Sequence, residues 1–103
     1  MNIKGSLRTL VLYTLSLGDK HGYEIGKTIR TKSDGVLDFK EGTLYPTLHN
    51  LEEDGLILGY DNPVGGRQRR YYQITDAGRD QLKANLHEWG TFVQAINAVL
   101  DSS

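Results

Sequence analysis

The sequence predicts a mostly α fold with a small two-stranded wing (α+β), followed by one long C-terminal helix. Three observations support this prediction. Leucines recur at helical spacing within residues 40–57. Two strand-like runs flank a Gly-containing turn directly after them, and a heptad-spaced apolar stripe occupies the C-terminal part of the chain.

The first two expected helices differ in how they are stabilised. In residues 7–17 apolar side chains lie on more than one helical face, so we expect burial on several sides and an end at Gly18. The second helix, residues 21–31, contains Gly22 and Gly26, which permit close approach to another helix but lower helix propensity. Tertiary packing must therefore hold it in place.

Residues 40–57 contain the third expected helix. Leu44, Leu48 and Leu51 form one apolar stripe at i, i+4 and i+7. Pro46 is tolerated where its missing N–H would have no helical partner, so we expect the helix to begin within the turn before it. The opposite face is small and polar, as suits a groove, and consists of Gly42, Thr43, Pro46, His49 and Asn50.

A short hairpin is expected next. Gly55 ends the third helix, residues 56–60 predict a strand, residues 62–66 a turn, and residues 67–74 a second strand. Three helices followed by strand, turn and strand is the order of a winged helix-turn-helix.

The last expected helix begins after Thr75, whose side chain can cap it, and runs to about Leu100. Its apolar residues have the spacing of a coiled-coil seam, and we expect this seam to pair with a second copy of the chain. The chain then divides into a winged helix-turn-helix of residues 1–75 and a dimerisation helix of residues 76–103. The seam residues are Leu82, Leu86, Trp89, Val93, Ile96 and Leu100.

Composition excludes several classes of function. The chain has no cysteine, which excludes a disulfide scaffold and a zinc finger built on thiolates. It has neither a signal-peptide apolar region after Met1 nor a run of membrane-spanning length, so we expect a cytoplasmic protein without membrane contact. The three histidines lack metal-site spacing, and no nucleophile motif or phosphate-binding loop occurs. We therefore expect no catalytic residue, metal or cofactor.

The sharpest basic feature is the cluster Arg67, Arg69 and Arg70 in the second strand. Nucleic-acid binders usually carry such a patch, although the net charge of the whole chain is −1. The cluster has two interpretations, a wing that contacts DNA or a solvated loop, which is the usual environment of a charge run.

Four motifs occur in order along the chain, namely HGYEI at His21, GTLYP at Gly42, LEEDGLI at Leu51 and GGRQRRYYQIT at Gly65. Together they resemble a PadR-type transcriptional regulator over nearly the whole chain. The resemblance implies a homodimeric repressor that binds an inverted repeat in double-stranded DNA and is released by a small molecule. The single terminal helix resembles the compact members of the family.

The resemblance also implies a set of DNA-binding residues. In such a domain the third helix enters the major groove, where base edges carry a sequence-specific pattern, while the wing reaches the backbone or the minor groove. His49 has an alternative interpretation as an ordinary exposed histidine. The residues assigned to DNA are Thr43, Tyr45, Pro46 and His49 on the helix and Arg67, Arg69 and Arg70 on the wing.

The seam has two interpretations as well. Trp89 either packs against the second copy, because aromatic side chains bury large areas, or lines a cavity between subunits that admits a flat apolar or aromatic effector. The second interpretation follows from the resemblance. The residues assigned to the effector site and dimer interface are Tyr13, Leu86, Trp89, Phe92, Val93 and Ile96.

Three further residues receive structural assignments. Tyr23 and Tyr72 sit among apolar neighbours at the period of their elements, so we expect both in the core. His21 precedes Gly22 at a helix start, where a local cap is favoured over a phosphate contact.

An alternative function uses the same fold without DNA readout. A winged-helix protein-interaction module would present the same face to an acidic protein, and the modest net charge is compatible with it. Salt titration separates the two functions, because DNA binding releases counterions and weakens steeply with added salt.

Overall fold

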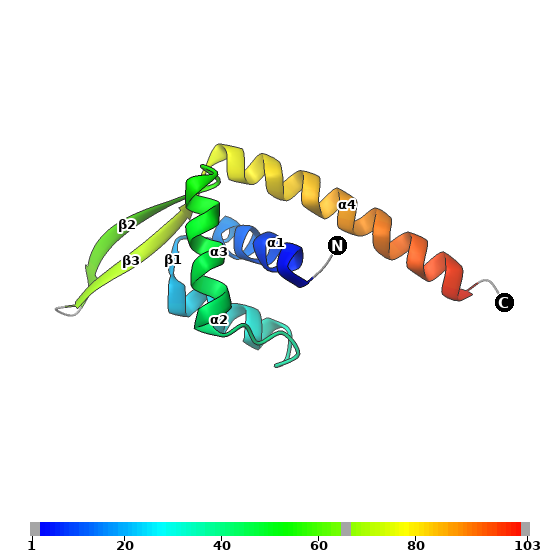
Figure 1. The fold of residues 1–103 in the computed structure, drawn as a ribbon, viewed down its shortest axis with the longest axis horizontal. Coiled ribbons are helices and arrows are strands. Elements are labelled where there is room, and N and C mark those ends of the chain that lie inside the picture. Colours follow the sequence, from blue (N-terminus) through cyan, green and yellow to red (C-terminus); the bar gives the residue numbers. More distant parts are fainter. Residues whose placement is uncertain (1–2, 65–66, 102–103) are drawn as a thin grey trace.

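The structure, a computed structural model, describes residues 3–64 and 67–101. Figure 1 shows α1, α2 and α3 packed as one unit, the β2–β3 hairpin projecting from one side, and α4 running past α1 and beyond it. The winged helix-turn-helix with a long terminal helix is confirmed. The elements are α1 (Ile3–Ser16), β1 (Lys20–His21), α2 (Gly22–Lys32), α3 (Glu41–Glu53), β2 (Ile57–Val64), β3 (Arg67–Ile74) and α4 (Asp76–Asp101).

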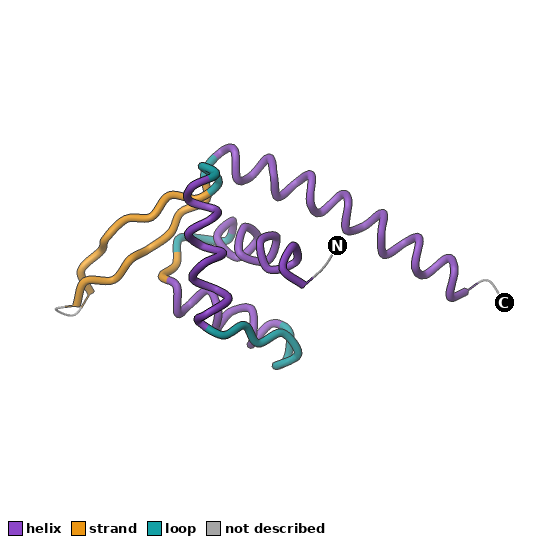
Figure 2. Tube along the Cα trace, viewed as in Figure 1, coloured by secondary structure: helices purple, strands orange, loops and turns teal. Residues whose placement is uncertain are grey.

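The sheet has one strand more than expected. Its order is β1-β3-β2, and all neighbouring strands are antiparallel. Figure 2 shows the strands in orange beside the purple helices. The strand β1 has only two residues, which is too short for any period-two pattern to reveal it. It ties the start of α2 to the middle of β3, where His21 is the register partner of Tyr71.

The hairpin is also longer than expected. Asn62, Pro63 and Val64 belong to β2, although they were predicted as a turn. Pro63 is tolerated there because β2 is an edge strand, where a missing N–H removes no bond to a further strand. The rest of the predicted turn, Gly65 and Gly66, lies outside the described residues. We call the β2–β3 hairpin the wing.

The core lies between the first three helices and the base of the wing. The leucine stripe of α3 is confirmed, because Leu44, Leu48 and Leu51 are all buried. Tyr72 is also a core residue, as predicted, with 6% of its surface exposed. The prediction for Tyr23 was wrong, since 62% of it is exposed. The reason is its position on α2, whose buried face consists of Gly22, Ile25 and Ile29.

A capping box begins α2. The Nδ1 atom of His21 accepts the backbone N–H of Glu24 at 3.2 Å, and the Glu24 carboxylate accepts the backbone N–H of His21 at 3.3 Å. The predicted local cap at His21 is therefore confirmed.

The bounds of α3 correct one expectation and confirm another. The helix begins at Glu41, a full turn before Pro46, so the proline lies where an N–H would have donated to the Gly42 carbonyl. Gly42 is exposed, and water can bind that carbonyl instead. The predicted stop at Gly55 is confirmed, because the helix ends at Glu53, Gly55 has φ 74° and the Leu56 N–H folds back to the Leu51 carbonyl at 3.0 Å.

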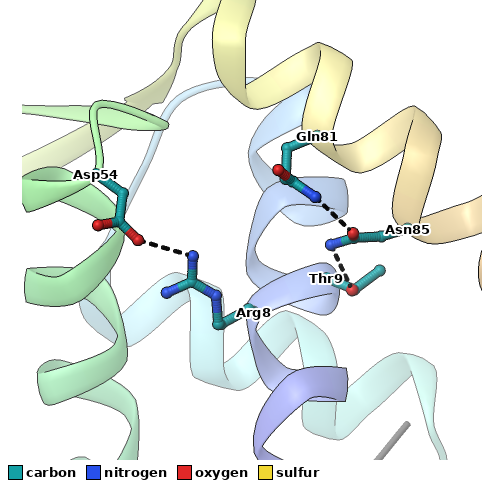
Figure 3. Close-up of polar contacts among 5 residues, drawn as sticks. All are labelled: Arg8, Thr9, Asp54, Gln81 and Asn85. Atoms are coloured by element: carbon teal, nitrogen blue, oxygen red, sulfur yellow. Dashed lines mark hydrogen bonds and ion pairs between the residues drawn. The ribbon is translucent and has the colours of Figure 1, made fainter.

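Two contacts seat α4 on the domain. The Thr75 hydroxyl accepts the Gly78 N–H at 3.0 Å, which confirms the predicted cap. Two turns further along, Asn85 donates to the Thr9 hydroxyl of α1 at 3.1 Å and accepts from Gln81 at 2.8 Å (Figure 3). Beyond these contacts α4 projects away from the domain and gives the molecule extents of 60 × 29 × 22 Å.

The helices of the described part are too short or too polar to cross a lipid bilayer.

Candidate nucleic-acid interface

One cleft joins the third helix to the wing. It has a volume of about 540 Å³ and lies between the start of α2, the exposed side of α3 and the strand β3. The structure thereby brings together Tyr45, Arg69 and Arg70, which the sequence placed in two separate motifs. We call this the reading cleft, and its lining residues are His21, Gly22, Tyr23, Tyr45, Arg69, Arg70 and Tyr72.

Tyr45 is positioned by the absence of a side chain at Gly22. A Cβ atom on Gly22 would lie 2.7 Å from Cε1 and 2.8 Å from the hydroxyl oxygen of Tyr45. The ring therefore lies directly on the first residue of α2, with its hydroxyl at the positive end of that helix. Such a helix start favours a bound anion.

The other predicted α3 residues are exposed but lie elsewhere on the helix. Thr43 and Pro46 line a second hollow of about 330 Å³ beside Arg8 of α1. His49 is exposed, and its Nε2 atom lies 3.1 Å from the Glu53 carboxylate. All four predicted residues of α3 therefore face solvent, on two sides of the helix.

The Arg69 guanidinium lies beside a histidine ring nitrogen that cannot accept a hydrogen bond from it. Its Nη1 atom lies 2.9 Å from Nε2 of His21, and that same Nε2 atom is 3.1 Å from the Glu24 carboxylate. Because Nδ1 of His21 accepts the capping N–H, the neutral ring carries its proton on Nε2 and directs it to Glu24. In this tautomer Arg69 gains no hydrogen bond from His21, so its guanidinium is available to an anion.

Arg70 is held very differently. Its Nη2 atom donates to the Glu52 carboxylate of α3 at 2.8 Å, and Nη1 lies 3.7 Å from the Asp61 carboxylate. The hydrogen bond and charge of Glu52 raise the pKa of Arg70.

Two tyrosines of the wing also have shifted pKa values. Burial is the main cause of the raised pKa of Tyr72. On the other side of the wing, the hydrogen bond from Tyr60 to Asp19, 2.7 Å long, raises the pKa of Tyr60. The Arg67 side chain lies outside the part of the chain that the structure describes.

A basic face that sequence reasoning missed adjoins the reading cleft. Tyr23, Lys27 and Arg30 recur at i, i+4 and i+7 along α2, and they line a hollow of about 550 Å³ together with Lys40 and Tyr45. The carboxylates of Asp38 and Glu41 line it as well, and Asp38 lies 3.8 Å from Nη1 of Arg30, so the surplus of positive charge comes from Lys27 and Lys40. The helical spacing of two cations and an aromatic residue was the signal in the sequence. It was overlooked because Tyr23 was assigned to the core.

The seam of α4 is largely uncovered. Among the assigned interface residues, Leu86, Trp89, Phe92 and Ile96 of α4 are each 43–45% exposed, and Tyr13 of α1 is 42% exposed. Val93 is half-buried. The rings of Trp89 and Phe92 lie side by side with centroids 5.9 Å apart.

Part of this seam borders an apolar cavity of about 310 Å³. Leu86 and Trp89 form one wall of it, and Phe92, Val93, Ile96 and Tyr13 do not line it. The opposite walls come from α1 and from the segment before α3, and they consist of Ser6, Thr9, Leu10, Leu37 and Phe39.

Comparison with known proteins identifies the family. Residues 11–84 match the model of the transcriptional regulator PadR-like family, and this range covers the end of α1, all of α2 and α3, the wing and the start of α4. The chain belongs to the PadR-like family of transcriptional regulators. The four sequence motifs were therefore correctly assigned.

Relatives and solved structures extend the PadR-like match over the full fold. The transcriptional regulator Rv3488 of Mycobacterium tuberculosis is 58% identical over 79 residues, which are 77% of this chain and 71% of the relative. A transcriptional regulator from Clostridium thermocellum is 38% identical, with a TM-score of 0.87 over 93% of this chain and 94% of its own. A PadR-like regulator from Bacillus cereus is 30% identical, with a TM-score of 0.85 over 98% and 97%. All three are transcriptional regulators.

Proposed function

We propose that this PadR-like regulator is a homodimeric repressor that binds an inverted-repeat operator in double-stranded DNA and is released by a small apolar or aromatic effector. The observation that carries the proposal is the reading cleft, which places Tyr45 of the third helix beside Arg69 of the wing. A helix and a wing that share one cleft can contact a base-pair groove and the adjoining backbone together.

Base readout is assigned to the exposed side of α3. Thr43, Pro46 and His49 all face solvent, while the leucine stripe on the opposite side anchors the helix in the core. The side chains that meet base edges are then presented by a rigid element. Hydroxyl and imidazole groups can distinguish the donor and acceptor pattern of the major groove.

Phosphate contacts are assigned to the reading cleft and the basic face beside it. The Tyr45 hydroxyl lies at the helix start of α2, and Arg69 has a guanidinium without a hydrogen bond from its neighbour. Lys27 and Lys40 line the adjoining hollow. This local gathering of cations explains how a chain of net charge −1 can bind DNA, because the contacts depend on the local field and not on the sum.

The dimer is assigned to the seam of α4. Its apolar side chains are more exposed than a stable monomer usually tolerates in one continuous stripe. Pairing two copies through this stripe would relate the two α3 helices by a two-fold axis. Helices about 34 Å apart would then meet successive major grooves of an inverted repeat.

The first prediction concerns Arg69, Thr43 and His49. Arg69→Ala should weaken binding to all DNA sequences and lower the slope of log affinity against log salt by about one, as the loss of one phosphate contact requires. Thr43→Val or His49→Ala should instead change the base preference at one position by about 1–3 kcal/mol. Fluorescence anisotropy over a salt series, with sites selected from random DNA, measures both effects.

The control for the lost charge is Arg79→Ala on α4, which lies in the first turn of that helix beside Asp76. It should bind like the wild type. Absence of any protected inverted repeat in footprinting, at low as well as high salt, would contradict the proposal. Equal losses on matched and scrambled sites for the α3 variants would contradict base readout.

The effector is assigned to the apolar cavity beside Trp89. Leu37 and Phe39 line this cavity, and Lys40 directly after them is the N-cap residue of α3. A ligand that enters must push against the segment that sets the start of the third helix. Binding in the cavity is thereby linked to the position of the DNA-contacting side chains.

The second prediction uses the single tryptophan of the chain as a reporter. Flat aromatic compounds that enter the cavity should quench Trp89 fluorescence and weaken operator binding over the same concentration range. Leu10→Trp fills the cavity, so DNA should no longer be released by such a compound. A compound library that changes neither the emission nor the DNA affinity would contradict this assignment.

A further inference from the structure

We infer that Arg70 is a positioning residue that fixes the angle of the wing against the third helix, and that it does not serve as a phosphate ligand. Only the test by operator affinity rests on the proposed DNA binding. Its structural basis is a set of contacts that the Arg70 guanidinium makes within the chain.

The first contact is with a glycine of the neighbouring strand. A Cβ atom on Gly59 of β2 would lie 2.6 Å from Nη2 and 2.8 Å from Cζ of Arg70. The guanidinium therefore lies directly on the Gly59 backbone. Glycine weakens a strand interior, and here its missing side chain leaves room for Arg70 to cross β2.

The second contact is with α3. On the far side of β2 the Arg70 guanidinium donates to the Glu52 carboxylate at 2.8 Å, and Glu52 lies at the end of α3. The Arg70 and Glu52 side chains are 48% and 24% exposed, so the pair is only partly accessible to solvent. A charge-assisted hydrogen bond of this length is stronger than one between neutral groups.

Two further groups surround the guanidinium. The Asp61 carboxylate, on the residue opposite Arg70 in the β2–β3 ladder, lies 3.7 Å from Nη1. The Tyr72 ring has its centroid 5.9 Å from Cζ. A phosphate that binds Nη2 of Arg70 would have to compete with the Glu52 carboxylate, and the Asp61 carboxylate beside Nη1 would repel it.

The contrast with Arg69 gives the two arginines separate roles. Arg69 faces a ring nitrogen of His21 that cannot accept a hydrogen bond from it, whereas Arg70 donates a hydrogen bond to a carboxylate of the third helix. The Arg70–Glu52 pair joins the wing to the end of α3, so the two DNA-contacting elements are held at one spacing. Holding them before DNA arrives removes an ordering cost from binding.

The test compares Arg70→Ala, Glu52→Ala and the double variant in the full chain. Each single variant should bind the operator about fivefold more weakly, as the loss of one partly exposed pair allows. The double variant should be no weaker than either single one. The salt slope should stay at the wild-type value, and the charge swap Glu52→Arg with Arg70→Glu should recover part of the affinity.

The sign of the Glu52→Ala effect is decisive, because removing a negative charge near DNA would by electrostatics alone strengthen binding. Tighter or unchanged binding by Glu52→Ala, together with a salt slope lowered by about one in Arg70→Ala, would show that Arg70 binds phosphate and would overturn the inference. Arg79→Ala and Glu88→Ala on α4 are the matched controls for each lost charge.

A measurement without DNA separates this inference from the proposed function. Thermal unfolding of the same variants should show coupling, with the double variant less destabilised than the sum of the two single ones. Additive losses would overturn the positioning role even if DNA binding holds. Absence of DNA binding by the wild type would contradict the proposed function. The thermal unfolding of the single and double variants would then still test whether Arg70 and Glu52 stabilise each other.

Discussion

The double variant Leu86→Asp with Val93→Asp is expected to be a monomer and to bind a two-site operator at least about a hundredfold more weakly than the wild type, because the linkage between half-sites is lost. Both residues lie on the seam of α4, where Leu86 is already half-exposed in the single chain. Two carboxylates placed in an apolar interface must either lose their hydration or prevent pairing. Sedimentation equilibrium measures the mass, and anisotropy measures the affinity for half-sites and full sites.

The matched control places the same charges on the other side of the same helix. Ala84 and Ala95 are exposed and lie roughly opposite the seam, so Ala84→Asp with Ala95→Asp should remain a dimer. The seam assignment would be wrong if the Leu86 and Val93 variant stayed dimeric. It would equally be wrong if the control dissociated to the same extent.

Gly78→Ala is expected to lower the free energy of unfolding by about 3 kcal/mol, the upper range for an overpacked site. A Cβ atom there would lie 2.1 Å from the Leu56 carbonyl oxygen and 2.8 Å from Cγ1 of Ile74. The carbonyl cannot move freely, since it also accepts the Thr75 N–H at 3.1 Å. Chemical denaturation followed by circular dichroism measures the loss.

Gly42→Ala is the control for the change from glycine to alanine in a helix. Nothing lies within 4 Å of a Cβ atom built there, so its stability should be unchanged or raised by up to about 1 kcal/mol. Wild-type stability in Gly78→Ala would mean that the first turn of α4 is not seated on Leu56. The attachment of α4 to the wing would then need another explanation.

The sequence was sufficient wherever one local pattern determined the structure. The leucine stripe of α3 and the heptad spacing of α4 each repeat over several turns, and both helices form where they were expected. The caps at His21 and Thr75 follow from short-range chemistry, because the donor and acceptor lie three residues apart.

Errors arose where the deciding contact joined distant segments. The strand β1 exists because two residues pair with β3, about fifty positions further along the chain. The wing extends through Pro63 because the partner strand continues beside it, although the local composition predicted a turn. Tyr23 was placed in the core from its apolar neighbours, but the direction of α2 turns it toward the basic face.

By itself, then, the sequence determined the order of the helices, the wing, the seam and the family to which they belong. Tertiary structure alone distinguished Arg69 from Arg70, which alternate across the same strand and cannot be assigned partners by periodicity. It also placed Leu86 and Trp89, but not Phe92 or Ile96, at the apolar cavity. The physical reason is common to both cases. Periodicity states which side of an element a residue occupies, whereas its role depends on the side chains that other elements bring to that side.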